Sequence, residues 1–314
     1  MQPIIAVQRI SKCFQRGNAV LRDVSFSIDK GEMVALIGAS GSGKSTLIRA
    51  VAGLTAIDRP RDGVTGSISV FGLRIQNGAG AIKAPKNIRM RIGVIFQQFN
   101  LVPRLSVLTN VCLGLLGRLP VIQGTLGRFN EADQRKAMDA LSRVGMAEHA
   151  LKRGVDLSGG QQQRAAIARC LVQQAEVLIA DEPIASLDPG SARRVVDTLA
   201  DMNRRDGITV IVSLHQVEYA LKYCPRTIAL KAGRIVYDGP SSALSLATLS
   251  EIYGAEAGDL FLPSLQQQSA PPAAQAKAPA IVSAAQILQE RATFNTLAAA
   301  RPLYVPPPES RLHA

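Results

Sequence analysis

One segment near the start of the chain constrains the fold more than any other. Residues 33–37 are entirely apolar and predict a short buried strand, which runs directly into the glycine-rich segment 38–45, Gly-x-x-x-x-Gly-Lys-Ser. Residues 46–54 then show helical spacing. In such a unit the glycines let backbone N–H groups turn toward a phosphate, and the helix adds its positive N-terminus. The segment therefore predicts a phosphate-binding loop.

Strand-like and helix-like segments alternate over the first 260 residues. Residues 177–180 and 208–214 are apolar enough for buried strands, and helical spacing from about 190 to 203 separates them. This alternation predicts an α/β fold with a mainly parallel sheet covered on both faces. Further strands are expected at residues 4–10, 24–28, 67–71 and 92–96, a hairpin at 226–230 and 234–237, and helices within 105–154 and 158–172. Residues 244–253 are expected to close the globular part.

The bulk composition argues against several classes of protein. The chain has 314 residues, of which 47% are hydrophobic, enough for one large domain or two small ones. It shows neither an export signal nor an uncharged apolar run of about 18 residues, so we expect no membrane-spanning helix. Its four cysteines are far apart and form no Cys-x-x-Cys pair, which favours reduced thiols over disulfides or a metal site.

The charge balance is basic. A net charge of +12 is a weak indication of a polyanionic partner. A local basic run of Lys83, Lys86, Arg89 and Arg91 contains no acidic residue, and we interpret it as a solvated face. Aromatic residues that would stack on bases do not interleave with this run, so we expect no nucleic-acid partner.

The composition changes near residue 265. From there to residue 314 the chain is rich in proline, alanine and glutamine, and such a segment cannot bury enough apolar surface to offset its loss of chain entropy. We therefore expect a globular domain over residues 1–260 and a mostly disordered tail over residues 265–314. Within the tail, residues 281–299 have the spacing of one amphipathic helix.

The phosphate-binding loop contains the residues expected to hold a nucleoside triphosphate. Lys44 is expected to reach the β- and γ-phosphates, and the Ser45 hydroxyl to coordinate Mg²⁺. A glycine-rich turn without function is the alternative, which the flanking strand and helix disfavour. The other predicted nucleotide contacts in this loop are Gly38, Ser40, Gly41, Gly43 and Thr46.

Two acidic residues follow the predicted strand at 177–180. Asp181 is expected to orient the Mg²⁺ shell, directly or through water, and it needs a partner because an unpaired carboxylate at the end of a buried strand is costly. Glu182 follows at the strand's carboxyl end, where a water could be aligned on the γ-phosphate, so it is the candidate general base. An ordinary surface acid is the alternative interpretation of Glu182.

A third segment, Leu157-Ser158-Gly159-Gly160-Gln161, lies in the sequence between the phosphate-binding loop and the acidic pair Asp181–Glu182. It begins a predicted helix. The phosphate-binding loop, this signature segment and the strand ending in Asp-Glu, in that order, resemble the ATP-binding-cassette (ABC) ATPases, over roughly residues 4–255. The resemblance implies an ABC nucleotide-binding domain of the phosphate-loop NTPase class. Such a domain has a mainly parallel core sheet flanked by helices, an antiparallel β subdomain and a helical subdomain that carries the signature.

The resemblance also implies roles for residues outside the phosphate-binding loop. Gln97 would sense Mg²⁺ and the attacking water, with Gln98 as the alternative one residue on, and His215 would contact the γ-phosphate. Phe14 would stack on adenine, and a core position on the first strand is its alternative. The residues that would cap the γ-phosphate bound by a second copy of the chain are Ser158, Gly159, Gly160 and Gln161.

The resemblance further implies partners. A signature segment that acts on the ATP of another copy implies a homodimer with two shared sites, and Asp188 lies in the segment that links them. Integral-membrane permease subunits would receive the motion through the surface near residues 97–107, and an extracytoplasmic solute-binding protein would act indirectly. The chain would then be peripheral, on the cytoplasmic face of the inner (cell) membrane.

Three strings are most similar to the ATPase subunits of phosphonate importers. They span residues 96–107, 181–189 and 213–220, and the last, Ser-Leu-His-Gln-Val-Glu-Tyr-Ala, is the most specific. Residues 58–65 and the tail depart from that group. The resemblance implies an ATPase that drives uptake of phosphonates or related organophosphorus anions. Within transport, importers of phosphate, polar amino acids or methionine are the alternatives.

Two alternatives come from other classes of function. A cassette acting on DNA would need a long coiled-coil insertion, and one acting on ribosomes typically carries a second phosphate-binding loop; the sequence contains neither. A nucleotide-binding scaffold without turnover is disfavoured because Glu182 and His215 are both present.

Overall fold

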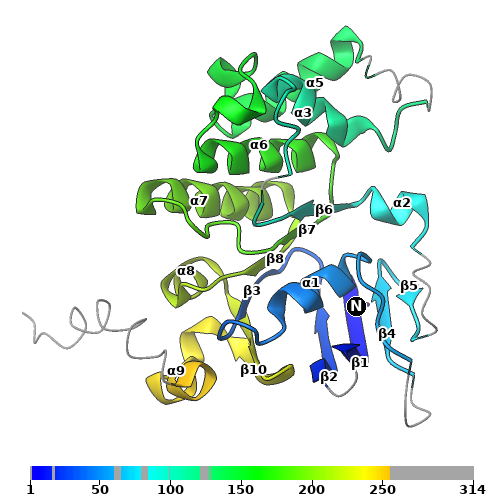
Figure 1. The fold of residues 1–314 in the computed structure, drawn as a ribbon, viewed down its shortest axis with the longest axis vertical. Coiled ribbons are helices and arrows are strands. Elements are labelled where there is room, and N and C mark those ends of the chain that lie inside the picture. Colours follow the sequence, from blue (N-terminus) through cyan, green and yellow to red (C-terminus); the bar gives the residue numbers. More distant parts are fainter. Residues whose placement is uncertain are drawn as a thin grey trace, which may run out of the picture. The chain divides into compact units, whose positions relative to one another are not determined.

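The computed structural model describes residues 2–15, 18–59, 65–78, 84–98, 100–120, 127 and 129–254 (Figure 1). The chain divides into two compact units, Met1–Leu265 and Gln266–Ala314, and every described residue belongs to the first. The predicted tail, with the amphipathic segment 281–299, therefore lies outside the described residues.

A mainly parallel sheet forms the centre of the first unit, with strand order β10-β9-β3-β8-β7-β6. Only β10 runs antiparallel to its neighbour, β9. The carboxyl ends of β3, β7 and β8 therefore meet at one edge of the sheet, where ligand sites of such sheets form. The strands are β3 (Met33–Ile37), β6 (Ile92–Ile95), β7 (Val177–Ala180), β8 (Thr209–Ser213), β9 (Arg226–Lys231) and β10 (Arg234–Pro240).

A second, antiparallel sheet has the strand order β2-β1-β4-β5. Its strands are β1 (Ile5–Gln15), β2 (Asn18–Ile28), β4 (Ser67–Val70) and β5 (Leu73–Gln76). The predicted strands at 4–10 and 24–28 are parts of longer strands, because backbone pairing continues through the polar residues toward the hairpin turn. Strand β5 was not predicted, since its sequence Leu-Arg-Ile-Gln offers only two apolar positions.

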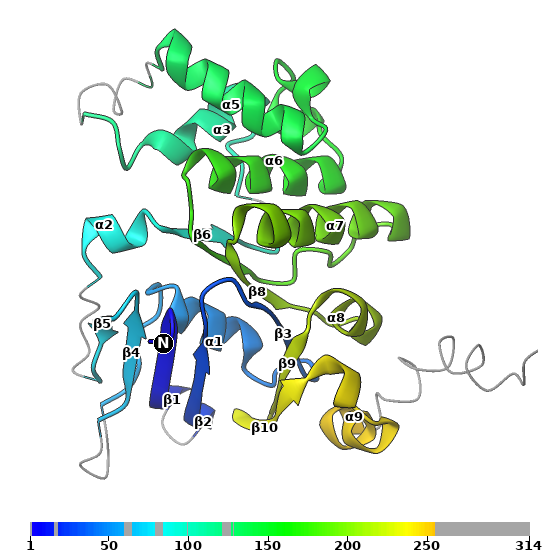
Figure 2. The same ribbon diagram turned by 180° about the vertical axis from the view of Figure 1, so that it is seen from behind.

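The helices fall into groups on the two faces of the core sheet. Figures 1 and 2 show α3, α5 and α6 together, with α7 between that group and the sheet. The helices are α1 (Lys44–Val51), α2 (Lys86–Arg89), α3 (Val107–Cys112), α5 (Glu131–Arg143), α6 (Gly159–Val172), α7 (Pro189–Asp206), α8 (Val217–Tyr223) and α9 (Leu246–Tyr253). Short 3₁₀ turns are η1 (Leu113–Leu115), η2 (Ala147–His149), η3 (Gly154–Asp156) and η4 (Ser241–Ala243).

Strand β3 shows how the core is divided. Successive strand side chains point to opposite faces, so Ala35 and Ile37 pack in the cluster that contains α6 and α7, while Val34 and Leu36 pack with α1 and the antiparallel sheet. All residues of β3 are buried, as the apolar run predicts for a strand covered on both faces.

Local signals explain where the long helix α7 begins and ends. Asp188 is its N-cap and accepts a hydrogen bond from the Ser191 N–H at 2.9 Å, and Pro189 occupies the first turn, where a missing N–H costs nothing. Gly207 ends the helix in the left-handed conformation, at φ 65°.

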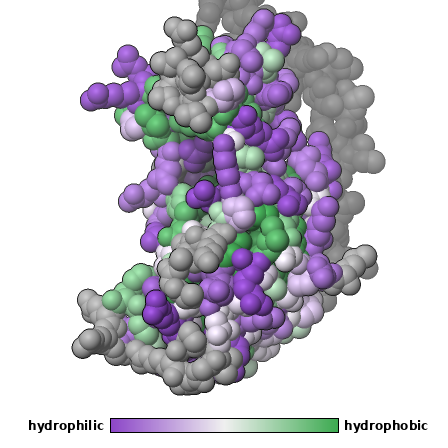
Figure 3. Space-filling view, turned by 90° about the vertical axis from the view of Figure 1, so that its right-hand side faces the viewer, coloured by the Kyte–Doolittle hydropathy of each residue, from purple (hydrophilic) through white to green (hydrophobic). Residues whose placement is uncertain are grey.

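The surface is mainly hydrophilic on the side of β5 and α2, with hydrophobic patches between the polar side chains (Figure 3). Lys86 and Arg89 are exposed there, as the interpretation of a solvated face requires. Arg91 differs, because its guanidinium lies 3.6 Å from the centre of the Phe71 ring and pairs with Glu176. Lys83 lies outside the described residues. Along the described residues, no helix has the length and apolar character that a bilayer crossing requires.

The cysteines are free thiols. Burial raises the pKa of Cys112 and Cys170 to about 11 and that of Cys224 to about 12, so these thiols are neutral at physiological pH. This state agrees with the predicted reduced thiols.

Candidate functional site

The phosphate-binding loop joins β3 to α1. Gly38 and Gly43 have φ values of 146° and 107°, a backbone conformation that residues other than glycine rarely adopt. A Cβ at Gly43 would also lie 2.8 Å from the Val20 carbonyl oxygen. Helix α1 begins at Lys44, two positions before the predicted start, because Gly43 itself is the N-cap. The exposed tip of the loop contains Ser40 and Gly41, while Thr46 is half-buried in the first turn of α1.

Lys44 lies folded into this loop. Its side chain is only 4% exposed, and Nζ donates hydrogen bonds to the carbonyl oxygens of Gly38 (2.8 Å) and Ala39 (3.2 Å). Nζ is also 4.0 Å from Oε1 of Glu182. The ammonium therefore lies against two backbone carbonyl acceptors of the loop and close to one acidic side chain.

Asp181 is paired, as its burial requires. It follows β7, is 4% exposed, and Oδ1 accepts hydrogen bonds from the hydroxyls of Ser45 and Ser213, each at 3.0 Å. The hydroxyl of Ser213 also accepts the backbone N–H of Glu182 at 2.7 Å. The predicted partner of Asp181 is thus found, but sequence reasoning missed Ser213. Its only signal was a polar residue at the end of an apolar strand.

An open cleft of about 510 Å³ extends from Asp181, at the end of β7, to Gln97. Gln97 follows β6, and the cleft is lined by Ser45 and Asp181 together with Gln97 and Gln98. The three residues predicted to handle Mg²⁺ therefore line one cavity. Among the residues that the structure describes, no group of three or more His, Cys, Asp or Glu side chains forms a dedicated metal cage.

His215 is exposed directly after Leu214, beyond the end of β8. Its ring centre is 6.4 Å from that of Tyr253, the last residue of α9. The Tyr253 hydroxyl accepts the buried N–H of Gly38 at 3.3 Å. Tyr253 therefore connects the end of α9 to both the phosphate-binding loop and His215, a link for which the sequence had no signal.

Phe14 is a surface residue of β1. Its side chain is 63% exposed, and Nζ of Lys12 lies 5.3 Å from the ring centre. The alternative interpretation of Phe14 as a core residue is therefore wrong, and its ring face is accessible for stacking.

The signature segment caps α6. The Ser158 hydroxyl accepts the Gln161 N–H at 3.4 Å, and the Gln161 side chain accepts the Ser158 N–H at 2.9 Å, which is a capping box. Ser158 is exposed and Gly159 half-buried, whereas Gly160 is packed so closely on α7 that a Cβ would lie 2.7 Å from Cβ of Ser191. The helix thus presents its N-terminus to solvent.

Asp188 forms hydrogen bonds within its own chain. Its carboxylate caps α7, and hydrogen bonds from the hydroxyl and N–H of Ser191 hold the pKa of this carboxyl below its usual range. The structure therefore places Asp188 at a helix N-terminus that faces the signature helix through Ser191 and Gly160.

Together, the fold and these motifs define a phosphate-loop nucleoside triphosphatase of the ATP-binding-cassette class, with the predicted core sheet, antiparallel sheet and helical group around the signature. The chain belongs to the ABC transporter family, whose model matches residues 21–185.

Similarity to curated relatives extends over most of the chain. It is 56% identical to the phosphonates import ATP-binding protein PhnC of Stutzerimonas stutzeri, over 87% of this chain and 97% of that protein. It is 57% identical to PhnC 2 of Pseudomonas aeruginosa, over 82% and 91%, respectively. For PhnC of Burkholderia pseudomallei the identity is 50%, over 87% and 90%.

Solved structures show the same fold. The dimeric structure of MJ0796, a bacterial ABC transporter cassette, is 30% identical, with a TM-score of 0.64 over 76% of this chain and 100% of that one. A dimeric post-hydrolysis state of the same cassette, bound to ADP and Pi, has a TM-score of 0.62 at 30% identity over the same shares. The chain therefore has the nucleotide-binding cassette fold.

Proposed function

We propose that this chain is the ATP-hydrolysing subunit of a membrane importer for phosphonates or related organophosphorus anions. Similarity to phosphonates import ATP-binding proteins supports the cargo, at 56% identity over 97% of the Stutzerimonas stutzeri protein. The ATPase activity is supported by the cleft shared by Ser45, Gln97 and Asp181, and by Glu182 beside Lys44.

The phosphate-binding loop would hold the triphosphate. When the phosphates enter, Lys44 exchanges its two carbonyl partners for the β- and γ-phosphate oxygens, while backbone N–H groups of the loop and the N-terminus of α1 surround the β-phosphate. Ser40, Gly41 and Thr46 belong to the same loop and first helical turn. Phe14 would stack on the adenine ring with its exposed face.

The donor set at the cleft fits Mg²⁺. The Ser45 hydroxyl and the Asp181 carboxylate are hard oxygen ligands whose oxygens already lie 3.0 Å apart, and Gln97 lines the same cleft. An ion held by few protein ligands and by substrate phosphates is the usual arrangement for Mg²⁺. With Ser45 and Asp181 as its protein ligands, the ion would offset the negative charge of the phosphates.

Glu182 is proposed to orient the attacking water and to accept its proton as the oxygen bonds to the γ-phosphorus and the bond to ADP breaks. His215, exposed past the end of β8, would contact the γ-phosphate. Gln97 would help to place the water. These side chains come from the carboxyl ends of β6, β7 and β8, which the sheet brings to one edge.

The signature segment is proposed to act on a second copy of the chain. Its capping box leaves the N-terminus of α6 open to solvent, and a helix N-terminus with a serine hydroxyl is suited to a γ-phosphate. Ser158, Gly159, Gly160 and Gln161 would cap the ATP of the partner copy, and the segment around Asp188 would connect the two shared sites. Dimeric cassettes among the solved relatives support this arrangement.

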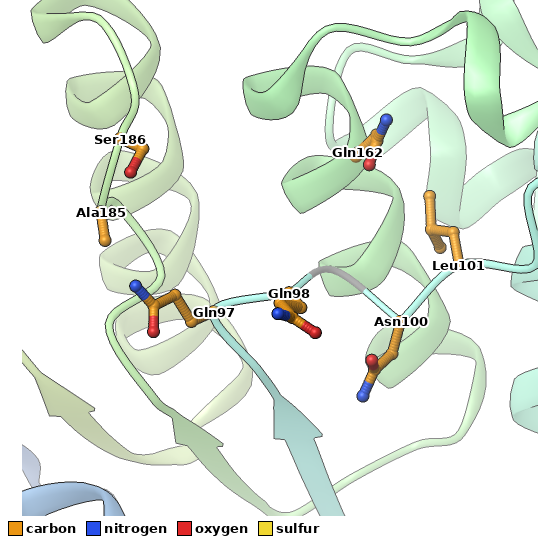
Figure 4. A pocket seen from close by; sticks show the side chains of 7 residues that line it. All are labelled: Gln97, Gln98, Asn100, Leu101, Gln162, Ala185 and Ser186. Carbon is orange, nitrogen blue, oxygen red and sulfur yellow. The ribbon is translucent and has the colours of Figure 1, made fainter.

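A permease is proposed to dock beside Gln97. Figure 4 shows a second cleft, of about 560 Å³, in which Gln97 and Ser186 face Gln162 and Leu101 across the gap. Nearby on the helical group, Val102, Leu151 and Val155 are 42%, 85% and 63% exposed. An exposed apolar patch beside a cleft suits the docking of a membrane subunit. The chain would then be peripheral to the cytoplasmic face of the membrane, with a solute-binding protein acting through the permease.

We further propose that residues 1–260 suffice for nucleotide hydrolysis and that residues 265–314 are dispensable for it. Each residue discussed above for nucleotide handling lies before position 254.

Growth tests the cargo. A cell that lacks this chain, and has no redundant cassette, should lose growth on phosphonates as sole phosphorus source and keep growth on inorganic phosphate. Expression of the intact chain should restore growth, and Lys44→Ala should not. Equal growth of mutant and parent on a panel of phosphonates and phosphite would contradict the cargo and leave the ATPase assignment standing.

A further inference from the structure

Ser213 stands out because it is the last residue of a strand that is otherwise apolar apart from Thr209. Its side chain is fully buried, with 0% exposure. A serine hydroxyl has one proton to donate and two lone pairs, and here both capacities are used on the acidic pair. The proton goes to Oδ1 of Asp181 at 3.0 Å, and a lone pair accepts the N–H of Glu182 at 2.7 Å.

The hydrogen bond from the Glu182 N–H to Ser213 fixes an unusual backbone conformation at Glu182. Glu182 has a φ of 48°, in the left-handed region that non-glycine residues adopt at a cost and keep only where surrounding contacts fix them. Its N–H donates to the Ser213 hydroxyl, and its carbonyl oxygen accepts the N–H of Ala185 at 3.2 Å. In this conformation the carboxylate of Glu182 lies 4.0 Å from Nζ of Lys44.

The first bond fixes the neighbouring carboxylate. Oδ1 of Asp181 receives two hydroxyl protons, one from Ser45 on α1 and one from Ser213 on β8. Ser45 is proposed to bind the metal ion, whereas Ser213, the last residue of β8, has no proposed ligand. Only the Ser213 contact therefore remains committed to orienting Asp181 when the site is loaded.

We infer that Ser213 is a positioning residue for hydrolysis, whose hydroxyl sets the carboxylate of Asp181 and the backbone of Glu182 in one arrangement. This inference rests on the proposed ATPase function. The role of Ser213 would be exerted through its two hydrogen-bonded neighbours, Asp181 and Glu182. Hydrogen-bonded partners of metal ligands commonly matter 10- to 100-fold for metal affinity or activity, and small displacements of catalytic groups have effects of similar size.

The test compares two buried hydroxyls on the same strand. Ser213→Ala removes the hydroxyl at the carboxyl end of β8. Thr209→Val removes the hydroxyl at the opposite end, which accepts the N–H of Gly31 at 2.9 Å and is also 0% exposed. Ser213→Ala loses two hydrogen bonds and Thr209→Val loses one, so a decrease in the thermal midpoint is expected from both variants, the larger one from Ser213→Ala. Only the first change borders the acidic pair.

Hydrolysis is measured with the full-length chain over a range of ATP and Mg²⁺ concentrations. Ser213→Ala should lower kcat about 10- to 100-fold with KM for ATP within about twofold, and raise the Mg²⁺ concentration for half-maximal rate. Thr209→Val should keep all three values within about twofold. A fluorescent ATP analogue provides a readout without turnover: Ser213→Ala should bind it normally in EDTA and gain less affinity than the parent when Mg²⁺ is added.

Three results would overturn the inference. One is a kcat of Ser213→Ala within twofold of the parent, and another is an equal loss in Thr209→Val, which would reduce Ser213 to a structural role. A parent chain without ATPase activity would refute the proposed function itself, and the inference with it. Failure of the phosphonate growth test alone leaves this inference intact, because the cargo does not contact the ATPase site.

Discussion

The phosphate-loop half of the site and the signature segment are built from similar residues but differ in how they are held. In the first half, Lys44 and Asp181 are each only 4% exposed, and their polar atoms bond to groups of their own chain. The signature segment has a capping box of its own and a further contact from Gln161 to His149, while Ser158 at its start is exposed. One half is internally complete and the other points outward.

This difference has a physical reason. Buried charged and polar groups must find partners inside the domain, so Asp181 and Lys44 are fixed by contacts to groups of the same domain. An uncovered helix N-terminus keeps unpaired N–H donors that water or an external anion can satisfy. The comparison therefore predicts that changes in the first half affect chemistry within one copy, while changes in the second act across two copies.

The largest effect is expected from Glu182→Gln. If Glu182 is the general base, turnover should fall about 10²- to 10⁴-fold while ATP binding is retained, because the amide cannot accept the proton. The variant should accumulate as an ATP-bound dimer, which size-exclusion chromatography with and without ATP will detect. Hydrolysis at the parent rate would remove Glu182 from its proposed role.

A heterodimer of two inactive variants tests the comparison most directly. Lys44→Ala disables the phosphate-binding loop. Gly159→Asp places a negative charge where the partner's γ-phosphate would lie. The helix itself tolerates this change, because an acidic residue is favourable at a helix N-terminus. Each homodimer should be nearly inactive. A heterodimer purified through two different tags contains one intact composite site and should regain up to about half of the parent activity.

The control for this experiment is a heterodimer of parent and Lys44→Ala, which also has one intact site. The contrary outcome is a mixed Lys44→Ala and Gly159→Asp heterodimer that stays as inactive as the two variant homodimers while the control hydrolyses ATP. In that case the signature segment acts within its own copy, and the proposed dimer is wrong.

Two truncations test which carboxy-terminal residues the phosphate-loop half of the site requires. Removal of residues 265–314 should leave the ATPase rate within about twofold and the thermal midpoint nearly unchanged. Removal of residues 246–314 also deletes α9, with the buried Leu249, Ile252 and Tyr253. Loss of three large buried side chains costs more than about 5 kcal/mol, comparable to the stability of a whole domain. A large decrease in the thermal midpoint on removal of residues 265–314 alone would show that the tail contributes to the fold.

The smallest effect concerns the amino end of β7, away from the acidic pair. A hydrogen bond from Arg91 holds the pKa of the Glu176 carboxyl below its usual range. A depressed pKa stabilises the fold above the ordinary carboxyl pKa and loses that contribution as pH falls through the folded value. Because both side chains are more than a third exposed, Glu176→Gln should cost less than about 1 kcal/mol at pH 7.

Urea unfolding at pH 7 and at pH 3 measures this contribution. The difference between Glu176→Gln and the parent should shrink at the lower pH, and the ATPase rate should be unchanged at pH 7. A loss of hydrolysis in this variant would mean that the acidic pair depends on both ends of β7.

Much of the fold could be predicted because its signals are local. The apolar runs of β3, β7 and β8, the hairpin of β9 and β10, and the helix that starts after Ser158 all occur where periodicity and caps place them. The errors fall where tertiary pairing outweighs local pattern. Strands β1 and β2 continue through polar residues because each pairs with the other, and β5 forms because β4 offers it an edge.

The sequence by itself determined which residues are candidates for the chemistry, since Gly38–Ser45, Asp181–Glu182 and the signature segment are each contiguous in the chain. Only the tertiary structure decided what holds them. The bonds of Ser213 to Asp181 and Glu182, and that of Tyr253 to Gly38, join residues 32, 31 and 215 positions apart, respectively. Such contacts depend on strand order and register, which side-chain periodicity does not encode.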